Sequence, residues 1–499
     1  MSGTTSFDVK FWDIKKRNDG RSRPWRVRWE VGGRESSEYF RTKALADGFR
    51  NKLLKAARAG EAFDVTTGLP VSEIRAKNSP PWFDFARGYV EHMWEHAATK
   101  TRRSMADALA TVTAVLVTSD RGAPDAKVLR RALYGWAFNC SKRGTIPPDD
   151  IASALSWISS ASVTVAAMSD PTVIRQALGA CGRKQDGKPA AATTFRRKRA
   201  VLHHALGHAV EQQLLDTNPV EQVQWKAPEV AKTIDRRVAA NPDQVRALLD
   251  AVSKQGKTGD RLTAFFGCIY YAGTRPSEAL AITVDNLTLP EQGWGRLDLV
   301  NSEPRAGVDW TDDGKPRDKR GLKRRGQYET RPVPIPPELV ALLRRHIDTY
   351  GTGEGGRLFC TLRGGPPQDS HYTALWRKAR AAALTPAQAA SPLARRPYDL
   401  RHAAVSLWLN AGVPATEVAR RAGHSVDVLL RVYANCVDGQ DQFVNDRIAD
   451  ALTGQQPAGE PGKPGQAGEA TDTPGAGCEI LDPHPAGTWR ADSGDPDVA

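Results

Sequence analysis

The chain has 499 residues, of which 40% are hydrophobic and 25% charged, a composition typical of globular proteins with buried cores. This excludes a wholly disordered chain, a collagen-like repeat and a small disulfide scaffold, and the length predicts about three domains. Lys and Arg number 70 against 57 Asp and Glu, so the formal charge of +13 favours a polyanionic partner such as nucleic acid.

The six cysteines are scattered and form no CxxC pair, so reduced thiols of a cytosol are expected rather than a zinc ribbon or a thioredoxin-type motif. The chain begins without an apolar segment, and no secretory signal is expected. The longest uncharged stretch, residues 151–169, contains six serines. It predicts a helix with a Ser-rich break and not a membrane span.

The first predicted elements form a small β-rich module. Residues 25–31 alternate apolar and charged side chains with period two, as in a half-buried strand. The Gly-Gly pair at 32–33 predicts a turn, and residues 37–40 a returning strand. Thr42 is expected to cap a helix that runs to about residue 59.

Basic residues crowd this N-terminal module, and two tryptophans, Trp25 and Trp29, lie among them. A run of charges is often only a solvated face. Because aromatic and basic side chains alternate here, we expect a small sheet that contacts DNA, with Arg26 and Arg28 as candidate DNA-binding residues and a solvated face as the alternative.

Residues 79–226 are predicted to be helical. A helix at about 191–215 carries four consecutive basic residues near its start, which we expect to contact phosphates, with a solvated patch as the alternative: Arg196, Arg197, Lys198 and Arg199. His204 and His208 have the spacing of metal ligands on a helix, but ordinary packed or solvated histidines are favoured. A charged, proline-containing stretch at 227–237 predicts a boundary.

The end of the chain, residues 451–499, differs from the rest. Pro and Gly make up 16 of its 49 residues, and eight acidic residues stand against two basic ones. This composition predicts disorder. The tail carries −6 of the total charge of +13, which leaves +19 for residues 1–450.

Four segments of the last third carry candidate chemistry. In the first, YYAGTRPSEAL at 270–280, Arg275 lies between two predicted helices and Glu278 lies in the first turn of the second, where it can orient a guanidinium. The second is basic at 319–325 and continues into 331–335, whose alternating prolines predict the edge strand of a β-hairpin.

The third segment, YDLRHAAVSLWL at 398–409, contains Arg401, and the fourth, AGHS at 422–425, contains His424. Tyr433 follows nine residues after that histidine. Arg and His are donors for anionic oxygens, and a tyrosine is a potential nucleophile.

In this order and spacing the segments resemble those of the tyrosine recombinases, the phage- and plasmid-type integrase family. The family pattern has an Arg in an A-G-x-R-x-x-E context, a β-hairpin Lys, an H-x-x-R box, a G-H box and a Tyr about nine residues further on. The matching catalytic positions are Arg275, Lys323, Tyr398, Arg401, His424 and Tyr433.

The resemblance implies a mainly α, multi-domain fold with small β-sheets. Its parts are an arm-type DNA-binding domain of sheet plus helix at 1–75, a helical, SAM-like core-binding domain at 79–226, a mixed α/β catalytic domain at 235–450, and the acidic tail. In the family a C-terminal helix often docks on a neighbouring subunit, and residues 437–452, with Phe443, Ile448 and Leu452, are the expected segment.

Two positions depart from the family pattern. Tyr398 stands where the H-x-x-R box has His, which puts in doubt how the nucleophile loses its proton. His402 follows Arg401, and from its helical spacing we expect it to point elsewhere and not to replace the missing histidine. Lys319 and Lys323 both lie near the hairpin, and Lys323 has the better distance from the return strand.

The implied activity is site-specific strand exchange, which integrates and excises a mobile element through a 3′-phosphotyrosine. It needs no metal, ATP or other cofactor, and no GxxxxGK[ST] loop is present. Implied partners are double-stranded DNA attachment sites, a tetramer on DNA and an accessory excision factor, in the nucleoid of a bacterial cytoplasm and away from membranes. The alternatives are a catalytically inactive DNA-binding regulator and a type IB topoisomerase.

Overall fold

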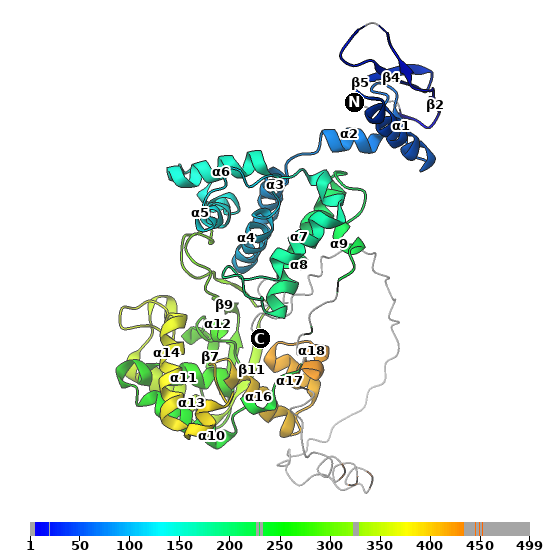
Figure 1. The fold of residues 1–499 in the computed structure, drawn as a ribbon. Helices are drawn as coiled ribbons and strands as arrows, with labels where there is room; N and C mark the ends of the chain where they lie inside the picture. Colours follow the sequence, from blue (N-terminus) through cyan, green and yellow to red (C-terminus); the bar gives the residue numbers. More distant parts are fainter. Residues whose placement is uncertain are drawn as a thin grey trace, which may run out of the picture. The chain divides into compact units, whose positions relative to one another are not determined.

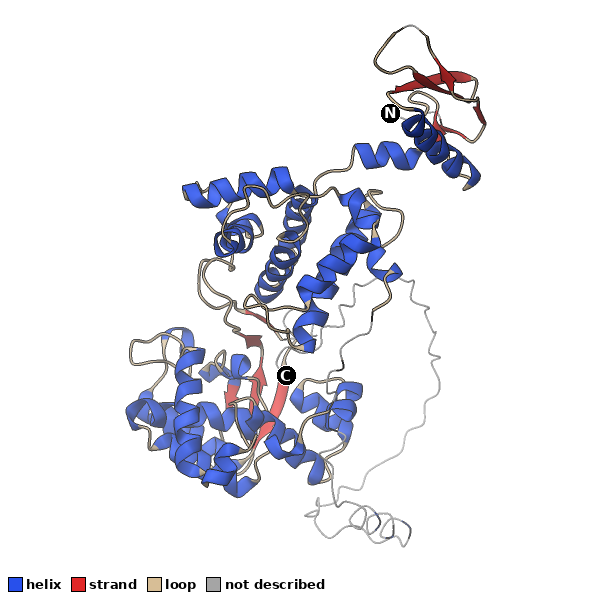
Figure 2. Cartoon of the chain, in the orientation of Figure 1, coloured by secondary structure: helices blue, strands red, loops and turns tan. Residues whose placement is uncertain are grey.

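The computed structural model describes residues 5–18, 20–225, 229, 233–322 and 329–433, together with residues 445, 449 and 452. The chain divides into two compact units, Met1–Pro228 and Glu229–Ala499. Strands occur in the N-terminal module and in the middle of the second unit, and helices make up most of the rest (Figure 2). The predicted fold class, mainly α with small β-sheets in several domains, is confirmed.

The N-terminal module is an antiparallel sheet with one helix, α1 (Lys43–Arg58). Its central strand is β4, which pairs with β5 on one side and with β2 and β3 on the other, while β1 pairs with β6. The strands are β1 (Thr5–Ser6), β2 (Val9–Phe11), β3 (Lys15–Lys16), β4 (Trp25–Val31), β5 (Arg34–Phe40) and β6 (Phe63–Asp64).

Period-two alternation explains how this sheet meets its helix. Val27, Trp29 and Val31 of β4 are buried in one cluster with Leu53 of α1, so the charged residues between them face the other side of the sheet. The turn at 32–33 has positive φ at both glycines, 53° and 82°, as a two-residue hairpin turn requires. Thr42 caps α1 by accepting a hydrogen bond from the Leu45 amide at 3.3 Å.

The rest of the first unit is helical (Figure 1). Its α-helices are α2 (Val71–Lys77), α3 (Trp82–Trp94), α4 (Thr99–Thr113), α5 (Ala126–Ala132), α6 (Asp149–Ala161), α7 (Pro171–Cys181), α8 (Ala192–Glu211) and α9 (Pro219–Gln222). Helix α4 contacts α3, α7 and α8 and buries most of its side chains among them. The stretch 151–169 is a helix up to Ala161 and a 3₁₀ turn, Val165–Ser169, as predicted. Among the described residues no helix is long and apolar enough to cross a membrane.

The second unit combines helices with a three-stranded antiparallel sheet of order β11-β8-β7, so β11 is the predicted edge strand. Its strands are β7 (Leu287–Thr288), β8 (Gly295–Leu299), β9 (Asn301–Ser302), β10 (Arg320–Gly321) and β11 (Arg331–Ile335). Its helices are α10 (Pro242–Ser253), α11 (Gly256–Tyr271), α12 (Pro276–Ala279), α13 (Pro337–Tyr350), α14 (Asp369–Ala383), α15 (Pro386–Ala390), α16 (Asp399–Asn410), α17 (Ala415–Ala422) and α18 (Val426–Tyr433).

Two hydrophobic cores build this unit. The larger joins α10, α11, α13 and α14 to the sheet, and the smaller joins α16, α17 and α18. In Figure 1 strand β11 lies between these two groups of helices. Helix α16 belongs to both, because its Leu400 is buried in the larger core and its Val405 in the smaller. Side chains from both cores therefore meet at α16.

We expect Phe265→Ala to lower the free energy of unfolding of the second unit by about 3–5 kcal/mol, because truncation leaves a cavity in a close-packed core. Phe265 is fully buried and lies 5.1 to 5.7 Å, ring centre to ring centre, from Phe266, Phe359 and Tyr372. Urea denaturation of the full chain measures the change. Trp294→Ala, which removes an aromatic side chain that is 62% exposed, should shift the midpoint little. Equal shifts for the two variants would contradict the assignment of the core.

Candidate active site

Arg275 lies at the start of α12, two residues after a tight glycine turn. Gly273 has φ 58°, and a Cβ built on it would lie 2.7 Å from the ring of Trp408. Pro276 occupies the first helical position, where no amide donor is needed. From there the Arg275 guanidinium donates from Nη1 to Oε1 of Glu278 at 2.7 Å. The sequence expectation that Glu278 orients this guanidinium agrees with this contact.

Glu278 is a buried carboxylate that two guanidiniums share. Arg331 donates to it from Nη1 at 3.2 Å and from Nη2 at 2.6 Å, in addition to the bond from Arg275. Burial by itself raises the pKa of the Glu278 carboxyl, but Arg331, Arg275 and Arg401 outweigh it and hold that pKa well below its ordinary value. The carboxylate is therefore charged throughout the physiological range.

Sequence reasoning did not identify Arg331 as a functional residue. The signal lay in the strand pattern, because Arg331 is in phase with Val333 and Ile335, and all three are buried. An arginine at a core-facing position of a strand needs a buried acceptor. Glu278 supplies it, and this ion pair ties the edge strand β11 to α12.

Arg401 is fully buried and extends from α16 towards the turn at Gly273. Its guanidinium donates to the backbone carbonyls of Gly273 and Ala422 and contacts Nε2 of His424 at 2.8 Å. Its Nε has no hydrogen-bond partner among the described residues. Carbonyl dipoles solvate this cation without neutralising it.

His424 follows Gly423, which ends α17 in the left-handed conformation at φ 65°. Burial and the nearby guanidiniums of Arg401, Arg275 and Arg331 lower the pKa of His424 far below its ordinary value, so the imidazole is neutral. A guanidinium has no acceptor, and Nε2 must therefore accept from Arg401. The ring proton then resides on Nδ1, a buried atom that has no hydrogen-bond partner among the described residues and is free to donate.

These groups carry an excess of positive charge. Three guanidiniums, those of Arg275, Arg331 and Arg401, surround one carboxylate, and the neighbouring imidazole of His424 is neutral. Two positive charges are therefore left without a carboxylate of the cluster. An anion with several oxygen acceptors, such as a phosphodiester, is the chemical complement of this arrangement.

Tyr433 is the last described residue of α18 and is buried, with 1% of its surface exposed. Its Oη lies 2.9 Å from Nδ1 of His402, and its ring centre lies 6.1 Å from that of His424. The expectation that His402 points away from the site is wrong. One residue along a helix is a rotation of about 100°, which turns Arg401 towards Gly273 and His402 towards α18.

Tyr398 precedes α16, and its ring meets His402 edge to face with centres 5.0 Å apart. It therefore lies beside the group that contacts Tyr433. Of the two candidate lysines, Lys323 lies outside the described residues. Lys319 is exposed directly before β10 and lines a pocket of about 320 Å³ with Asn301 and Glu303.

The four basic residues of α8 do not form one exposed patch. Lys198 is buried, and its ammonium donates to Thr111 at 2.9 Å and lies 3.7 Å from the Asp107 carboxylate. Arg197 contacts the same carboxylate at 3.1 Å, and Arg199 stacks on Trp225. Only Arg196 and Arg197 are exposed. The expectation that Lys198 contacts phosphates is therefore wrong, because its side chain packs inside the helical region.

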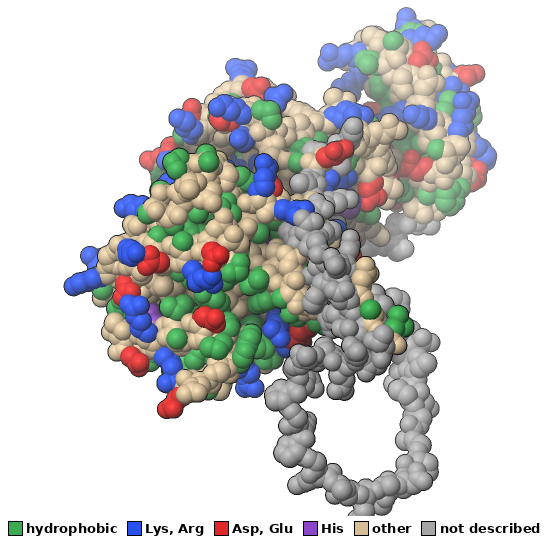
Figure 3. All heavy atoms as spheres, turned by 90° about the horizontal axis from the view of Figure 1, so that it is seen from below, with side chains coloured by type: hydrophobic (Ala, Val, Ile, Leu, Met, Phe, Trp, Pro, Cys, Tyr) green, Lys and Arg blue, Asp and Glu red, His purple; other side chains and the backbone are tan. Residues whose placement is uncertain are grey.

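On the N-terminal sheet, Arg26 and Arg28 lie on the face opposite α1. Arg28 stacks on Trp12 at 4.1 Å, and Arg26 lies 5.8 Å from the ring of Tyr39. Both residues are half-buried. Lys and Arg side chains are spread over the visible surface of this module in Figure 3.

Two histidines of α8 have close polar partners within the helical region. His203 lies 2.7 Å from a carboxylate oxygen of Glu221, and His204 lies 2.6 Å from the hydroxyl of Tyr89. Within the described part of the chain, no group of three or more His, Cys, Asp or Glu residues is arranged to hold a metal ion.

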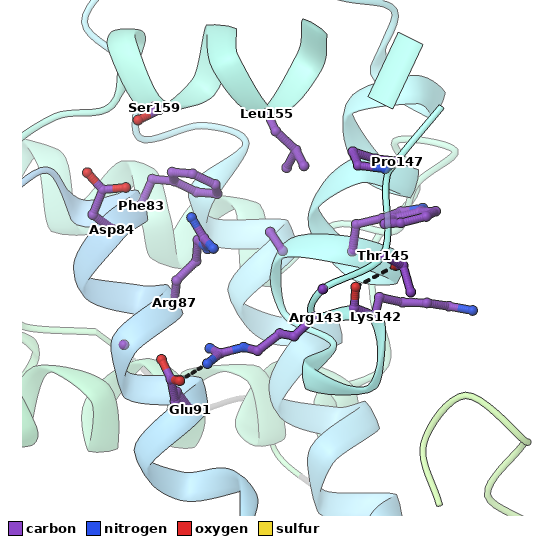
Figure 4. A pocket seen from close by; sticks show the side chains of 14 residues that line it. Phe83, Asp84, Arg87, Glu91, Lys142, Arg143, Thr145, Pro147, Leu155 and Ser159 are labelled. Carbon is purple, nitrogen blue, oxygen red and sulfur yellow. Dashed lines mark hydrogen bonds and ion pairs between the residues drawn. The ribbon is translucent and has the colours of Figure 1, made fainter. Parts of the chain in front are cut away.

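A pocket of about 530 Å³ lies in the helical part of the first unit. Figure 4 shows Arg87 and Arg143 pointing into it, with the Arg143 guanidinium paired to Glu91. Its wall includes Trp136 of the π-helical turn Leu133–Ala137.

Residues 240–439 match the model of the phage integrase family, and this part of the chain is a domain of that family. It contains all the residues that the structure brings together around Glu278 and His402. No curated protein matches the chain at a significant level.

Several solved structures are similar to the chain. The Tn1549 transposon integrase in complex with transposon right-end DNA is 16% identical, with a TM-score of 0.43 over 62% of this chain and 96% of that one. A lambda integrase dimer bound to a COC′ core site is 13% identical, with a TM-score of 0.45 over 86% and 95%. The XerH site-specific recombinase bound to difH is 13% identical, with a TM-score of 0.40 over 70% and 96%.

We expect Glu278→Gln to destabilise the second unit by about 3–5 kcal/mol at neutral pH, because it leaves two buried guanidiniums without their carboxylate. The folded-state pKa of Glu278 is depressed, so its contribution is present above the unfolded-state pKa of about 4.3 and is lost as pH falls below it. The difference between wild type and variant, measured by urea denaturation, should therefore shrink from pH 5 to pH 3.

Glu417→Gln is the matched control. Glu417 also binds two arginines, Arg420 and Arg421, but its side chain is 29% exposed. Its loss should reduce stability by about 1 kcal/mol or less. A Glu278 variant as stable as the Glu417 variant would show that the buried carboxylate does not hold the site together.

Proposed function

We propose that this chain is a site-specific tyrosine recombinase that integrates and excises a mobile DNA element. The observation that carries the proposal is the cluster of Arg275, Arg331 and Arg401 around a single carboxylate, beside a tyrosine. Its surplus positive charge suits a phosphodiester whose oxygens gain charge during cleavage. The phage integrase family domain at 240–439 supports the same proposal.

In the proposed reaction Tyr433 Oη attacks the scissile phosphate. A 3′-phosphotyrosyl bond forms, the bond from phosphorus to the 5′-oxygen breaks, and that oxygen leaves as a hydroxyl after taking a proton, with Lys323 as the proposed donor. Arg275 and Arg401 bind the non-bridging oxygens, and His424 donates through Nδ1. Because the ester conserves the bond energy and cations supply the positive charge, neither ATP nor a metal is required.

The site is closed in the described conformation. Arg401 has no exposed surface and Tyr433 has 1%. A phosphate reaches these side chains only if the segments over them move, so we propose that DNA binding opens the site. Such coupling keeps the nucleophile from water until DNA is bound.

The rest of the chain is proposed to hold DNA. Residues 1–75 form an arm-type domain with Arg26 and Arg28 on its open sheet face, residues 79–226 a core-binding domain, and residues 235–450 the catalytic domain. Exchange between two duplexes, each cut on both strands, requires four active sites, so a tetramer assembles on DNA at the attachment sites. Excision uses an accessory protein. The segment 437–452, expected to join neighbouring subunits, falls almost entirely outside the described residues, Phe443 and Ile448 included.

Covalent trapping tests the proposed chemistry. We expect the full chain, mixed with nicked DNA tiled from the regions that flank its gene, to form an adduct that survives a denaturing gel. Tyr433→Phe should abolish the adduct, and Arg401→Ala should slow its formation by about 100- to 1,000-fold, the effect of losing one oxyanion donor. Tyr350→Phe, which removes a hydroxyl bound to Asp260 in the same unit, is the matched control and should react normally.

Two results would contradict the proposal. Salt-sensitive binding without any adduct would identify an inactive DNA-binding regulator, for which the tyrosine at position 398 is the supporting feature. Relaxation of any supercoiled plasmid, without preference for one sequence, would identify a topoisomerase.

The sheet face of the N-terminal module makes a separate prediction. Binding weakens with salt in proportion to the number of phosphates contacted, so Arg26→Gln and Arg28→Gln should each reduce the slope of log Kd against log salt by about 1. Lys52→Gln, on α1 and paired with Glu73, should leave the slope unchanged. Identical slopes for all three variants would exclude this face from the DNA interface.

A further inference from the structure

His402 and Tyr433 make a polar contact in the interior of the second unit. Nδ1 of His402 lies 2.9 Å from Oη of Tyr433, and the two residues are 3% and 1% exposed. They come from different helices, α16 and α18, of the same unit. A buried hydrogen bond between an imidazole and a phenol aligns a proton acceptor with a proton that a nucleophile must lose.

We propose that His402 is the proton acceptor that activates Tyr433. The inference rests on the proposed function, since it assigns a role within that reaction. A free phenol has a pKa of about 10 and is a weak nucleophile at neutral pH, so a group within hydrogen-bonding distance has to take its proton. Imidazole is the side chain suited to that transfer.

Two neighbouring groups are poor alternatives. His424 uses Nε2 to accept from Arg401, and the adjacent guanidiniums oppose a second proton on its ring. Tyr398 is itself a phenol, whose ordinary pKa matches that of the nucleophile, and its ring meets His402 edge to face. We infer that Tyr398 helps to orient the imidazole, while His402 takes the proton.

The proton balance defines the tautomer. Before cleavage His402 is neutral with its proton on Nε2, and Nδ1 accepts from Oη. As the bond from Oη to phosphorus forms and the bond to the 5′-oxygen breaks, the phenol proton moves to Nδ1 and leaves an imidazolium. When the 5′-hydroxyl of the exchanging strand attacks, the phenolate departs and the imidazolium returns the proton to it.

The test measures single-turnover cleavage of nicked DNA by the full chain. We expect His402→Ala to reduce the rate constant for adduct formation by about 100-fold or more, the usual contribution of a general base, with unchanged DNA affinity in a gel shift. His402→Asn keeps a hydrogen-bonding group near Oη but cannot take a proton, so it should be as slow as His402→Ala. An Asn variant that cleaves at the wild-type rate would mean that His402 only holds the tyrosine, and would overturn the proposal.

A modified substrate separates the two proton transfers. A 5′-bridging phosphorothiolate releases a thiolate, which needs no proton from an acid. The His402 variants should remain slow on this DNA, since the nucleophile still has to lose its proton. Recovery to the wild-type rate would assign His402 to the leaving group and overturn the proposal.

His346→Asn is the matched control for folding. His346 is also buried in this unit and contacts the Leu358 carbonyl through Nε2 at 2.9 Å, away from Tyr433. It should cleave at the wild-type rate. If the wild-type chain forms no adduct, the proposed function fails and this inference with it. If the wild type forms the adduct and His402→Ala forms it equally fast, this inference alone fails.

Discussion

One buried carboxylate, that of Glu278, is the constraint around which the site is built. It holds Arg275 at the start of α12 and Arg331 on the edge strand β11, two cations that would otherwise repel one another in a medium of low dielectric constant. The ion pair between Glu278 and Arg331 connects the first turn of α12 to the edge strand β11. The electrostatics of the site and the position of the strand therefore depend on each other.

The carboxylate does not balance the charge of the whole cluster. Arg401 is held by backbone carbonyls of Gly273 and Ala422, which orient it without cancelling its charge. Burial and the unbalanced charge together lower the pKa of His424, so this histidine is neutral and can act as a donor. In the proposed reaction, proton transfer and anion binding thus fall to different imidazoles, His402 for the first and His424 for the second.

Much of this was readable from the sequence, and what was not has a physical reason. Arg275, Arg401, His424 and Tyr433 stand in short local patterns, and the strand at 25–31 follows from alternation alone. His402 contacts Tyr433, 31 residues away, and Arg331 contacts Glu278, 53 residues away. These contacts depend on tertiary packing, which a local sequence pattern cannot predict. The burial of Lys198 was predictable from helical spacing, because it lies four residues before the buried Leu202 on the inner face of α8. Its place in a run of four basic residues favoured an exposed patch instead.

The close approach of Trp408 to Gly273 couples α16, which carries Arg401, to the turn before α12, where Arg275 lies. The indole belongs to the helix of Arg401, and the glycine carbonyl accepts from that arginine. A larger residue at 273 would displace α16 unless position 408 became smaller at the same time. Because φ at position 273 is also positive, a smaller residue at 408 would relieve the contact but not the backbone strain, so glycine should be retained at 273 among homologues whatever residue stands at 408.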